Sequence, residues 1–270
     1  MRYIIDHDFH IHSKLSICSE DPNQTPENIL KYAKENGFKK IILTDHYWDE
    51  KVDRGDIDWF YKEQPTDHIK EALPLPCDNE VEFLFGAETE LSYDLIIGAT
   101  KETIDELDFI IIPTTHLHFN GFTIKTDDGK TPERRAELWV ERLDFVLNQD
   151  LPFHKVGIAH LSCCLMANIS REFFLETLKA IPEKEMERLF KKAADLGVGI
   201  ELNGGDFRNE LNSPDLEDIL KMFRIAKKQG CKFYFGTDAH SEGGYKGARE
   251  MFEKLVDLLE LTEEDKFYLK

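Results

Sequence analysis

Residues 109–118 read Phe-Ile-Ile-Ile-Pro-Thr-Thr-His-Leu-His, a short apolar run that ends on two histidines. An apolar run without polar alternation is typical of a parallel strand that is buried on both faces. The same unit recurs at residues 39–46, which read Lys-Lys-Ile-Ile-Leu-Thr-Asp-His. The pattern predicts a parallel sheet whose strands end on polar, potentially functional side chains.

Strand-like and helix-like segments alternate along the chain. We expect seven strands, at residues 3–11, 39–44, 81–87, 109–115, 155–159, 198–202 and 232–236. Helices are expected at residues 26–36, 132–148, within 171–196, at 214–229 and at 245–259. This order predicts an α/β fold with a parallel sheet, either a closed barrel or a doubly wound sheet. Periodicity alone does not choose between the two.

The length of 270 residues suits one α/β barrel, which commonly needs about 250 residues. We therefore expect a single domain over residues 1–270, with a long loop insertion at about 47–80. A second long loop is expected at 119–131. Long loops after barrel strands are common places for substrate specificity, and an ordinary surface excursion is the alternative.

Charge and composition limit the partners and the location of the protein. The formal net charge of -19 makes a nucleic-acid partner unlikely, although bound cations would still allow a phosphorylated substrate. The five cysteines show no CxxC pair, so we expect free thiols in a reducing compartment. No signal peptide and no apolar stretch near the ~20 residues of a membrane span is present, which predicts a cytoplasmic protein.

Metal-ligand side chains gather at the expected strand ends. In a parallel barrel all of these ends open onto one rim. So many buried carboxylates and imidazoles are costly unless metal ions compensate them, and this ligand set suits zinc, manganese or iron. Residues two apart on a strand share a face, which groups His10 with His12 and places Asp8 in register with them. His7 has the opposite phase and is interpreted as structural. The strand-end residues are His10 and His12, Asp45 and His46, Glu88, His116 and His118, His160, Glu201, and Asp238 with His240.

At these residues the chain resembles the PHP (polymerase and histidinol phosphatase) family. The resemblance spans Asp8 to about Gly247 and implies a distorted, TIM-like (β/α)7 barrel that binds three divalent metal ions at the carboxyl ends of its strands. A histidinol-phosphatase-like branch is one possibility within the family. The most specific motifs are Asp8-Phe9-His10-Ile11-His12-Ser13, Leu43-Thr44-Asp45-His46, Gly86-Ala87-Glu88 and Gly236-Thr237-Asp238-Ala239-His240-Ser241.

The resemblance also implies a role for each ligand. His10, His12, Glu88 and Asp238 would hold one ion. Glu88 would bridge to a second ion, completed by His116 and His160, and His118 is the alternative to His116. His46 and His240 would hold a third ion with one loop residue among Cys18, Glu20 and Asp21. We prefer Asp21, because oxygen ligands suit manganese or iron. Arg208 would contact the phosphate of the substrate, because a guanidinium binds two phosphate oxygens at once.

The expected activity is hydrolysis of a small phosphomonoester by a metal-activated hydroxide. Asp238, His240 and Glu88 would take part in the reaction, with Asp238 or a neighbouring histidine orienting the water or accepting its proton. Four alternatives stay open: a phosphatase specific for histidinol phosphate, a 3'-5' exonuclease on single-stranded nucleic acid, an amidohydrolase and a non-catalytic metal-binding module. The exonuclease would require a basic rim, and the amidohydrolase a strand-end lysine that we do not find.

Overall fold

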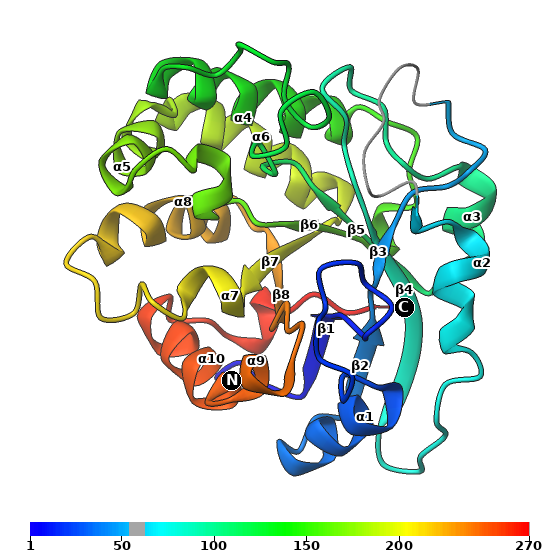
Figure 1. Cartoon of the computed structure of the whole chain (residues 1–270). Coiled ribbons are helices and arrows are strands. Elements are labelled where there is room, and N and C mark those ends of the chain that lie inside the picture. The colour runs from blue at the N-terminus through cyan, green and yellow to red at the C-terminus, as the bar shows by residue number, and fades with distance from the viewer. Residues whose placement is uncertain (54–62, 270) are drawn as a thin grey trace.

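Seven parallel strands form a nearly closed barrel surrounded by helices in the computed structural model, which describes residues 1–53 and 63–269 (Figure 1). Neighbouring strands follow the order β1-β2-β4-β5-β6-β7-β8, and the two-residue strand β3 pairs with the end of β4. The closed arrangement confirms the predicted TIM-like barrel and excludes an open doubly wound sheet. The strands are β1 (His7–Ile11), β2 (Lys40–Leu43), β3 (His46–Tyr47), β4 (Glu82–Thr89), β5 (Phe109–Pro113), β6 (Val156–Ala159), β7 (Gly199–Asn203) and β8 (Lys232–Gly236).

The helices follow the expected segments closely. Thr25 and Thr131 cap α1 and α4, each accepting a backbone hydrogen bond of the first turn, and a proline follows each cap. The α-helices are α1 (Pro26–Glu35), α2 (Thr66–Ile69), α3 (Lys101–Glu106), α4 (Pro132–Leu147), α5 (Arg171–Ala180), α6 (Glu183–Leu196), α7 (Gly204–Phe207), α8 (Leu216–Lys228), α9 (Glu242–Tyr245) and α10 (Ala248–Leu258). The short 3-10 helices are η2 (Lys70–Ala72), η3 (Phe153–Lys155), η4 (Cys164–Ala167) and η5 (Glu263–Asp265). No helix among the described residues is long and apolar enough to cross a membrane.

Two expected elements have different bounds. The first strand begins at His7 rather than at Tyr3, because Tyr3 bonds to Leu261 and Phe233 outside the sheet register. The expected final helix, 245–259, begins later, as α10 at Ala248, because Gly247 before it has a left-handed φ of +69°. Residues 54–62 of the predicted 47–80 insertion lie outside the described residues.

The hydrophobic core has two parts, because successive side chains of a strand point to opposite faces of the sheet. Ile110 and Ile112 of β5 join the large cluster between the barrel and its helices. Phe109 and Ile111 point the other way, into a smaller cluster inside the barrel. This inner cluster fills the barrel with apolar side chains, so the polar strand ends are restricted to its rim. Its buried members are Phe9, Ile42, Phe109, Ile111, Ala159, Tyr234 and Phe267.

The seam between β1 and β8 is closed by backbone and side-chain hydrogen bonds. Asp238 N donates to His10 O at 2.8 Å, and His12 N donates to Ala239 O at 3.1 Å. The pairing of β1 with β2 is irregular between Asp8 and Ile11, so the alternation of side chains is broken there. For this reason the side chain of Asp8 does not point in the same direction as those of His10 and His12. The expectation that these three residues share a face is wrong.

Asp8 instead ties β1 to α1 and β8. Its buried carboxylate accepts hydrogen bonds from Tyr32 Oη at 3.0 Å and from Thr237 Oγ1 at 2.7 Å. The backbone N–H groups of His10 and Thr237 also donate to it, at 3.2 and 3.0 Å. This one side chain therefore satisfies four donors at the seam of the barrel.

We predict that Asp8→Ala lowers the free energy of unfolding by about 3 kcal/mol or more, because it leaves buried donors without an acceptor. Urea unfolding in the presence of a chelator measures this cost without a contribution from bound metal. Asp195→Ala, at an exposed aspartate in the last turn of α6, is the matched control and should change stability by less than about 0.5 kcal/mol. Equal stabilities for the two variants would contradict the role of Asp8.

Candidate metal centre

The carboxyl ends of the strands surround a pocket of about 290 Å³. Histidines and carboxylates from β4 and from the segments that follow β2, β5, β6 and β8 face it, so residues far apart in sequence meet there. The pocket is lined by Cys18, His46, Glu88, His116, His118, Phe119, His160, Leu165, Asp238 and His240.

One group of side chains is centred on the carboxylate of Glu88. His10, Glu88, His160 and Asp238 each offer a ligand atom within 4.8 Å of the others. Glu88 Oε2 lies 3.4 Å from His10 Nε2, and Glu88 Oε1 lies 3.3 Å from His160 Nε2. Glu88 has no exposed surface, and neither of its oxygens accepts a hydrogen bond from the described residues. A buried carboxylate with both oxygens directed at imidazole nitrogens fits a position between metal ions.

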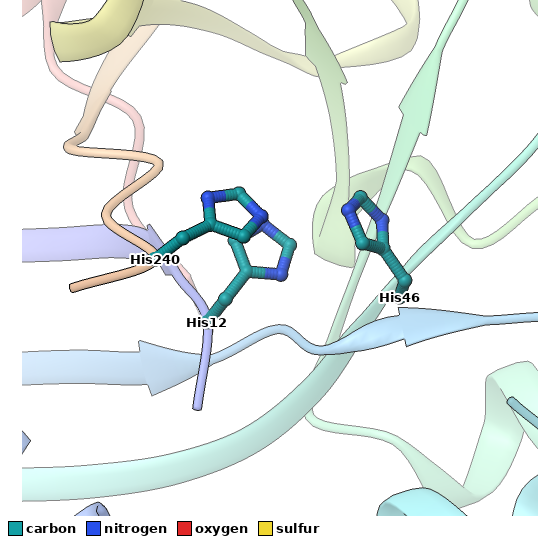
Figure 2. A group of neighbouring side chains, drawn as sticks. All are labelled: His12, His46 and His240. Carbon is teal, nitrogen blue, oxygen red and sulfur yellow. The ribbon is translucent and has the colours of Figure 1, made fainter. Parts of the chain in front are cut away.

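A second group joins His12, His46 and His240, whose ring nitrogens also lie within 4.8 Å of one another. Figure 2 shows the overlapping rings of His12 and His240, with the ring of His46 across from them. The centroids of the two overlapping rings are 4.0 Å apart. His46 Nδ1 lies 2.9 Å from Glu88 Oε2, so the two groups meet at this carboxylate.

The outer nitrogens of the histidines are fixed by hydrogen bonds. His10 Nδ1 donates to Glu201 Oε1 at 2.6 Å, and His116 Nδ1 donates to Glu90 Oε1 at 2.7 Å. His160 Nδ1 lies 3.4 Å from Asp206 Oδ1. A ligating histidine usually gives its other N–H to a carboxylate in this way, which fixes the tautomer and directs the free nitrogen to the metal.

His12 is fixed through a hydroxyl. His12 Nδ1 donates to Ser16 Oγ at 2.9 Å, and Ser16 Oγ donates to Asp45 Oδ1 at 2.7 Å. Sequence patterns alone assign no role to Ser16, Glu90 or Asp206. Glu90 could have been noticed, because it lies two residues beyond Glu88 and therefore near the same strand end.

Gly236 provides the space for the His10–Glu201 pair. A Cβ atom at this position would overlap with the side chains of His10 and Glu201. The glycine of the Gly236-Thr237-Asp238 motif is therefore needed for packing, and the candidate ligand of the motif is Asp238.

Two candidate ligands have an unusual backbone conformation. His160 has a φ of +61° and Asp238 a φ of +53°, in the left-handed region that residues other than glycine rarely occupy. Such strain persists where the surrounding structure imposes it, and it is concentrated at functional sites. His160 directly follows β6 and Asp238 lies two residues beyond β8, and both side chains line the pocket.

The charges in the pocket depend on one another. Burial raises the pKa of Glu88, but the imidazoles of His10 and His46 outweigh burial and hold this pKa well below its usual range. Burial also opposes the charged form of His10, while Glu201, Glu88 and Asp238 raise the pKa of its imidazole. The carboxylate of Glu88, and likewise that of Asp238, is therefore held in its ionised form by the neighbouring imidazoles. Imidazole nitrogens with ionised carboxylates are the donor set of zinc, manganese and iron sites, so the residues present fit divalent metal ions.

The structure distinguishes the three candidates from the loop after His12. Cys18 lines the pocket, and although burial raises its pKa, the neighbouring His46 and His240 lower the pKa of its thiol to about 6. Asp21 Oδ2 instead accepts from Glu242 N at 3.2 Å, and Asp21 does not line the pocket. Glu20 is exposed. The geometry therefore favours Cys18 as the partner of His46 and His240, in place of Asp21, which we expected from the sequence.

Arg208 does not lie in the pocket. Its Nη1 donates to the carbonyl oxygen of Lys246 at 2.9 Å, and its Nη2 donates to that of Gly244. The guanidinium thus holds the segment around α9, which does not support the predicted contact with phosphate. Asp206, two residues earlier, is the residue of this segment that reaches a candidate ligand.

Both His116 and His118 line the pocket, but their surroundings differ. His116 is oriented by Glu90, whereas His118 Nδ1 has no hydrogen-bond partner among the described residues. The ring of His118 lies against Phe119, with a centroid distance of 3.7 Å. Burial and the nearby His116 lower the pKa of His118 to about 3, so its imidazole is neutral. The orientation favours His116 as the ligand and leaves His118 facing the pocket.

His7 has the environment of a structural histidine. Its Nδ1 lies 3.0 Å from Asp6 Oδ1, and its Nε2 accepts a hydrogen bond from Phe235 N at 3.1 Å. Both nitrogens are thus used within the fold, away from the pocket.

Solved structures with the same architecture include two at low sequence identity. The histidinol phosphate phosphatase of Lactococcus lactis subsp. lactis Il1403, complexed with zinc, L-histidinol and phosphate, is 17% identical, covers 97% of this chain and 98% of its own, and has a TM-score of 0.61. A candidate histidinol phosphatase from Listeria monocytogenes is 13% identical, with 91% and 99% coverage and a TM-score of 0.60. At these identities the likeness shows a shared fold.

No curated protein matches the sequence at a significant level. The model of the PHP domain, in contrast, matches residues 8–205, which include the candidate ligands from His10 to His160. The resemblance seen in the sequence motifs is thereby confirmed, and the chain belongs to the PHP domain family.

Proposed function

We propose that this chain is a metal-dependent phosphoesterase that hydrolyses a small phosphomonoester. The observation that carries the proposal is the position of Glu88, a fully buried carboxylate whose two oxygens face histidines from different strands. Membership of the PHP domain family supports the same reaction class.

The contacts suggest how the ligands divide among metal ions. Glu88 Oε2 faces the first site, which has His10, His12 and Asp238 as further ligands. Glu88 Oε1 faces His160, which with His116 completes the second site. His46 and His240 make up the third site, and Cys18 is its additional ligand. A thiolate beside two imidazoles suits zinc better than manganese.

Bound divalent ions would supply the main chemistry, because they lower the pKa of water and neutralise the charge of the phosphoryl group. The protein side chains fix the reacting groups. Asp238 is the candidate proton acceptor: its side chain is 20% exposed to the pocket, while Oδ1 lies 3.1 Å from His12 Nε2 and Oδ2 lies 3.6 Å from His160 Nε2. Glu88 and His240 would act by holding the ions in place. The neutral His118 faces the pocket as a candidate substrate contact.

The size and lining of the pocket favour a small substrate. Its volume of about 290 Å³ is at the lower end of the range for ligand pockets. No lysine or arginine lines it among the described residues, so the metal ions would meet the phosphate charge. Phe119 and Leu165 offer apolar surface to the rest of the substrate. Histidinol phosphate is one candidate, because the similar structure from Lactococcus lactis is complexed with L-histidinol and phosphate. The net charge of -19 disfavours an exonuclease.

We predict that His10→Ala and Asp238→Ala each abolish hydrolysis of p-nitrophenyl phosphate in the presence of added manganese or zinc, because each removes a first-site ligand. His154→Ala is the matched control, since His154 is exposed in η3, and it should keep the native rate. Initial rates of the purified full chain measure the effect. Native rates in both ligand variants would refute the proposed site.

A second prediction concerns the third site. Cys18→Ala should lower the number of zinc ions retained per chain by one, because the thiolate is the proposed additional ligand of His46 and His240. Asp21→Asn and Cys77→Ala should retain the native number, since Asp21 bonds to Glu242 and Cys77 is exposed. Elemental analysis after dialysis against a fixed free zinc concentration makes the comparison. Loss of an ion from Asp21→Asn, but not from Cys18→Ala, would restore the choice of Asp21.

A further inference from the structure

Three side chains of helix α4 donate hydrogen bonds in the interior of the protein. Arg135, Trp139 and Arg142 are spaced four and three residues apart and therefore share one face of the helix. Their exposed fractions are 5%, 0% and 1%. The core-facing side of such a helix is usually apolar, and a buried arginine is costly unless its donors are satisfied.

Arg142 binds backbone carbonyls beyond the ends of β4 and β5. Its Nε donates to Thr114 O at 2.6 Å, and its Nη2 donates to Leu91 O at 2.7 Å. Its Nη1 donates to Ser92 O at 3.0 Å and to Thr123 O at 2.9 Å. Burial lowers the pKa of Arg142 to about 10, so the guanidinium keeps its charge at neutral pH. One side chain thus joins three separate loop segments.

Arg135 and Trp139 extend this pattern to the next loop. Arg135 donates to the carbonyl oxygens of Leu117, Gly129 and Met166. Trp139 Nε1 donates to Leu161 O at 3.1 Å. Gly129 is shaped for this contact, because its φ is +62° and a Cβ atom there would lie 2.6 Å from Arg135 Nε. The long 119–131 loop is therefore attached to α4 by both arginines.

Several of these carbonyls lie beside the histidines proposed for the second metal site. Thr114 and Leu117 lie on either side of His116, and Leu161 directly follows His160. Leu91 directly follows Glu90, which orients His116. Backbone carbonyls beyond a strand end have no partner within the sheet, so a buried donor must satisfy them. The first site shares Glu88 with the second, but its other ligands are His10 of β1, His12 directly after β1, and Asp238 after β8, and none of the three α4 side chains binds the backbone there.

We propose that Arg135, Trp139 and Arg142 of α4 are positioning residues for the second metal site. They hold the backbone on both sides of His116 and the backbone that follows His160, and they act through that backbone without touching a metal or a substrate. The inference rests on the proposed function, because it assumes that Glu88, His116 and His160 bind an ion. Substitution of groups that orient metal ligands commonly weakens metal binding by about 10–100-fold.

The test uses Arg142→Lys and Arg135→Lys in the full chain. Each variant keeps the positive charge but loses the planar fork that reaches several carbonyls at once. Zinc binding is measured by competition with a chromophoric chelator after the protein has been stripped of metal. We expect one class of zinc site to weaken by about 10–100-fold in each variant, with the other sites unchanged.

Two controls separate positioning from general stability. Arg188→Lys changes an exposed arginine of α6 that pairs with Asp144 and Glu185, and it should keep native affinity at every site. Leu189→Ala creates a cavity in the core of α6, so it should lower the urea stability of the metal-free protein while zinc affinity stays native. Native zinc affinities in both α4 variants would overturn the inference, as would a uniform weakening of all sites that follows the loss of stability. A native chain that binds no zinc would overturn the proposed function as well.

Discussion

The burial of the Glu88 carboxylate is the constraint on which the rest of the site depends. An ionised carboxylate without solvent contact is costly unless positive charge lies beside it. β4 carries Glu88 to the rim of the barrel, where His10, His46 and His160 bring nitrogens to within 2.9–3.4 Å of its oxygens. The inner apolar cluster lies below it and excludes water from that side. Positive charge beside Glu88, from these imidazoles or from metal ions that they bind, therefore stabilises the buried carboxylate.

The surrounding structure fixes the direction of several candidate ligands. Glu201, Ser16 and Glu90 each occupy the outer nitrogen of one histidine, so the other nitrogen faces the pocket. Asp8 closes the seam that carries His10 and His12, and α4 holds the loops that carry His116 and His160. Ligands supported in this way are arranged before a metal binds, which lowers the cost of organising the site.

Local sequence patterns were sufficient for the parallel strands and for most candidate ligands, whereas the choice of a barrel came from the family resemblance. Apolar strands that end on histidine or carboxylate must bring those side chains to one rim when the strands are parallel. Prediction from the sequence failed where contacts between distant residues determine the position of a side chain. The irregular register of β1 directs Asp8 toward Tyr32. Arg208 donates hydrogen bonds to backbone carbonyls around α9, and Asp21 accepts one from the backbone of Glu242. Arg135 and Arg142 stand out on the apolar face of α4, but their carbonyl partners are known only from the fold.

Anomalous diffraction from crystals grown with zinc tests the central claim most directly. The account predicts separate zinc peaks next to the two oxygens of Glu88, one contacted by His10, His12 and Asp238 and the other by His116 and His160. It would be contradicted by a Glu88 carboxylate that makes direct hydrogen bonds to these histidines, with no anomalous peak within coordination distance of either oxygen.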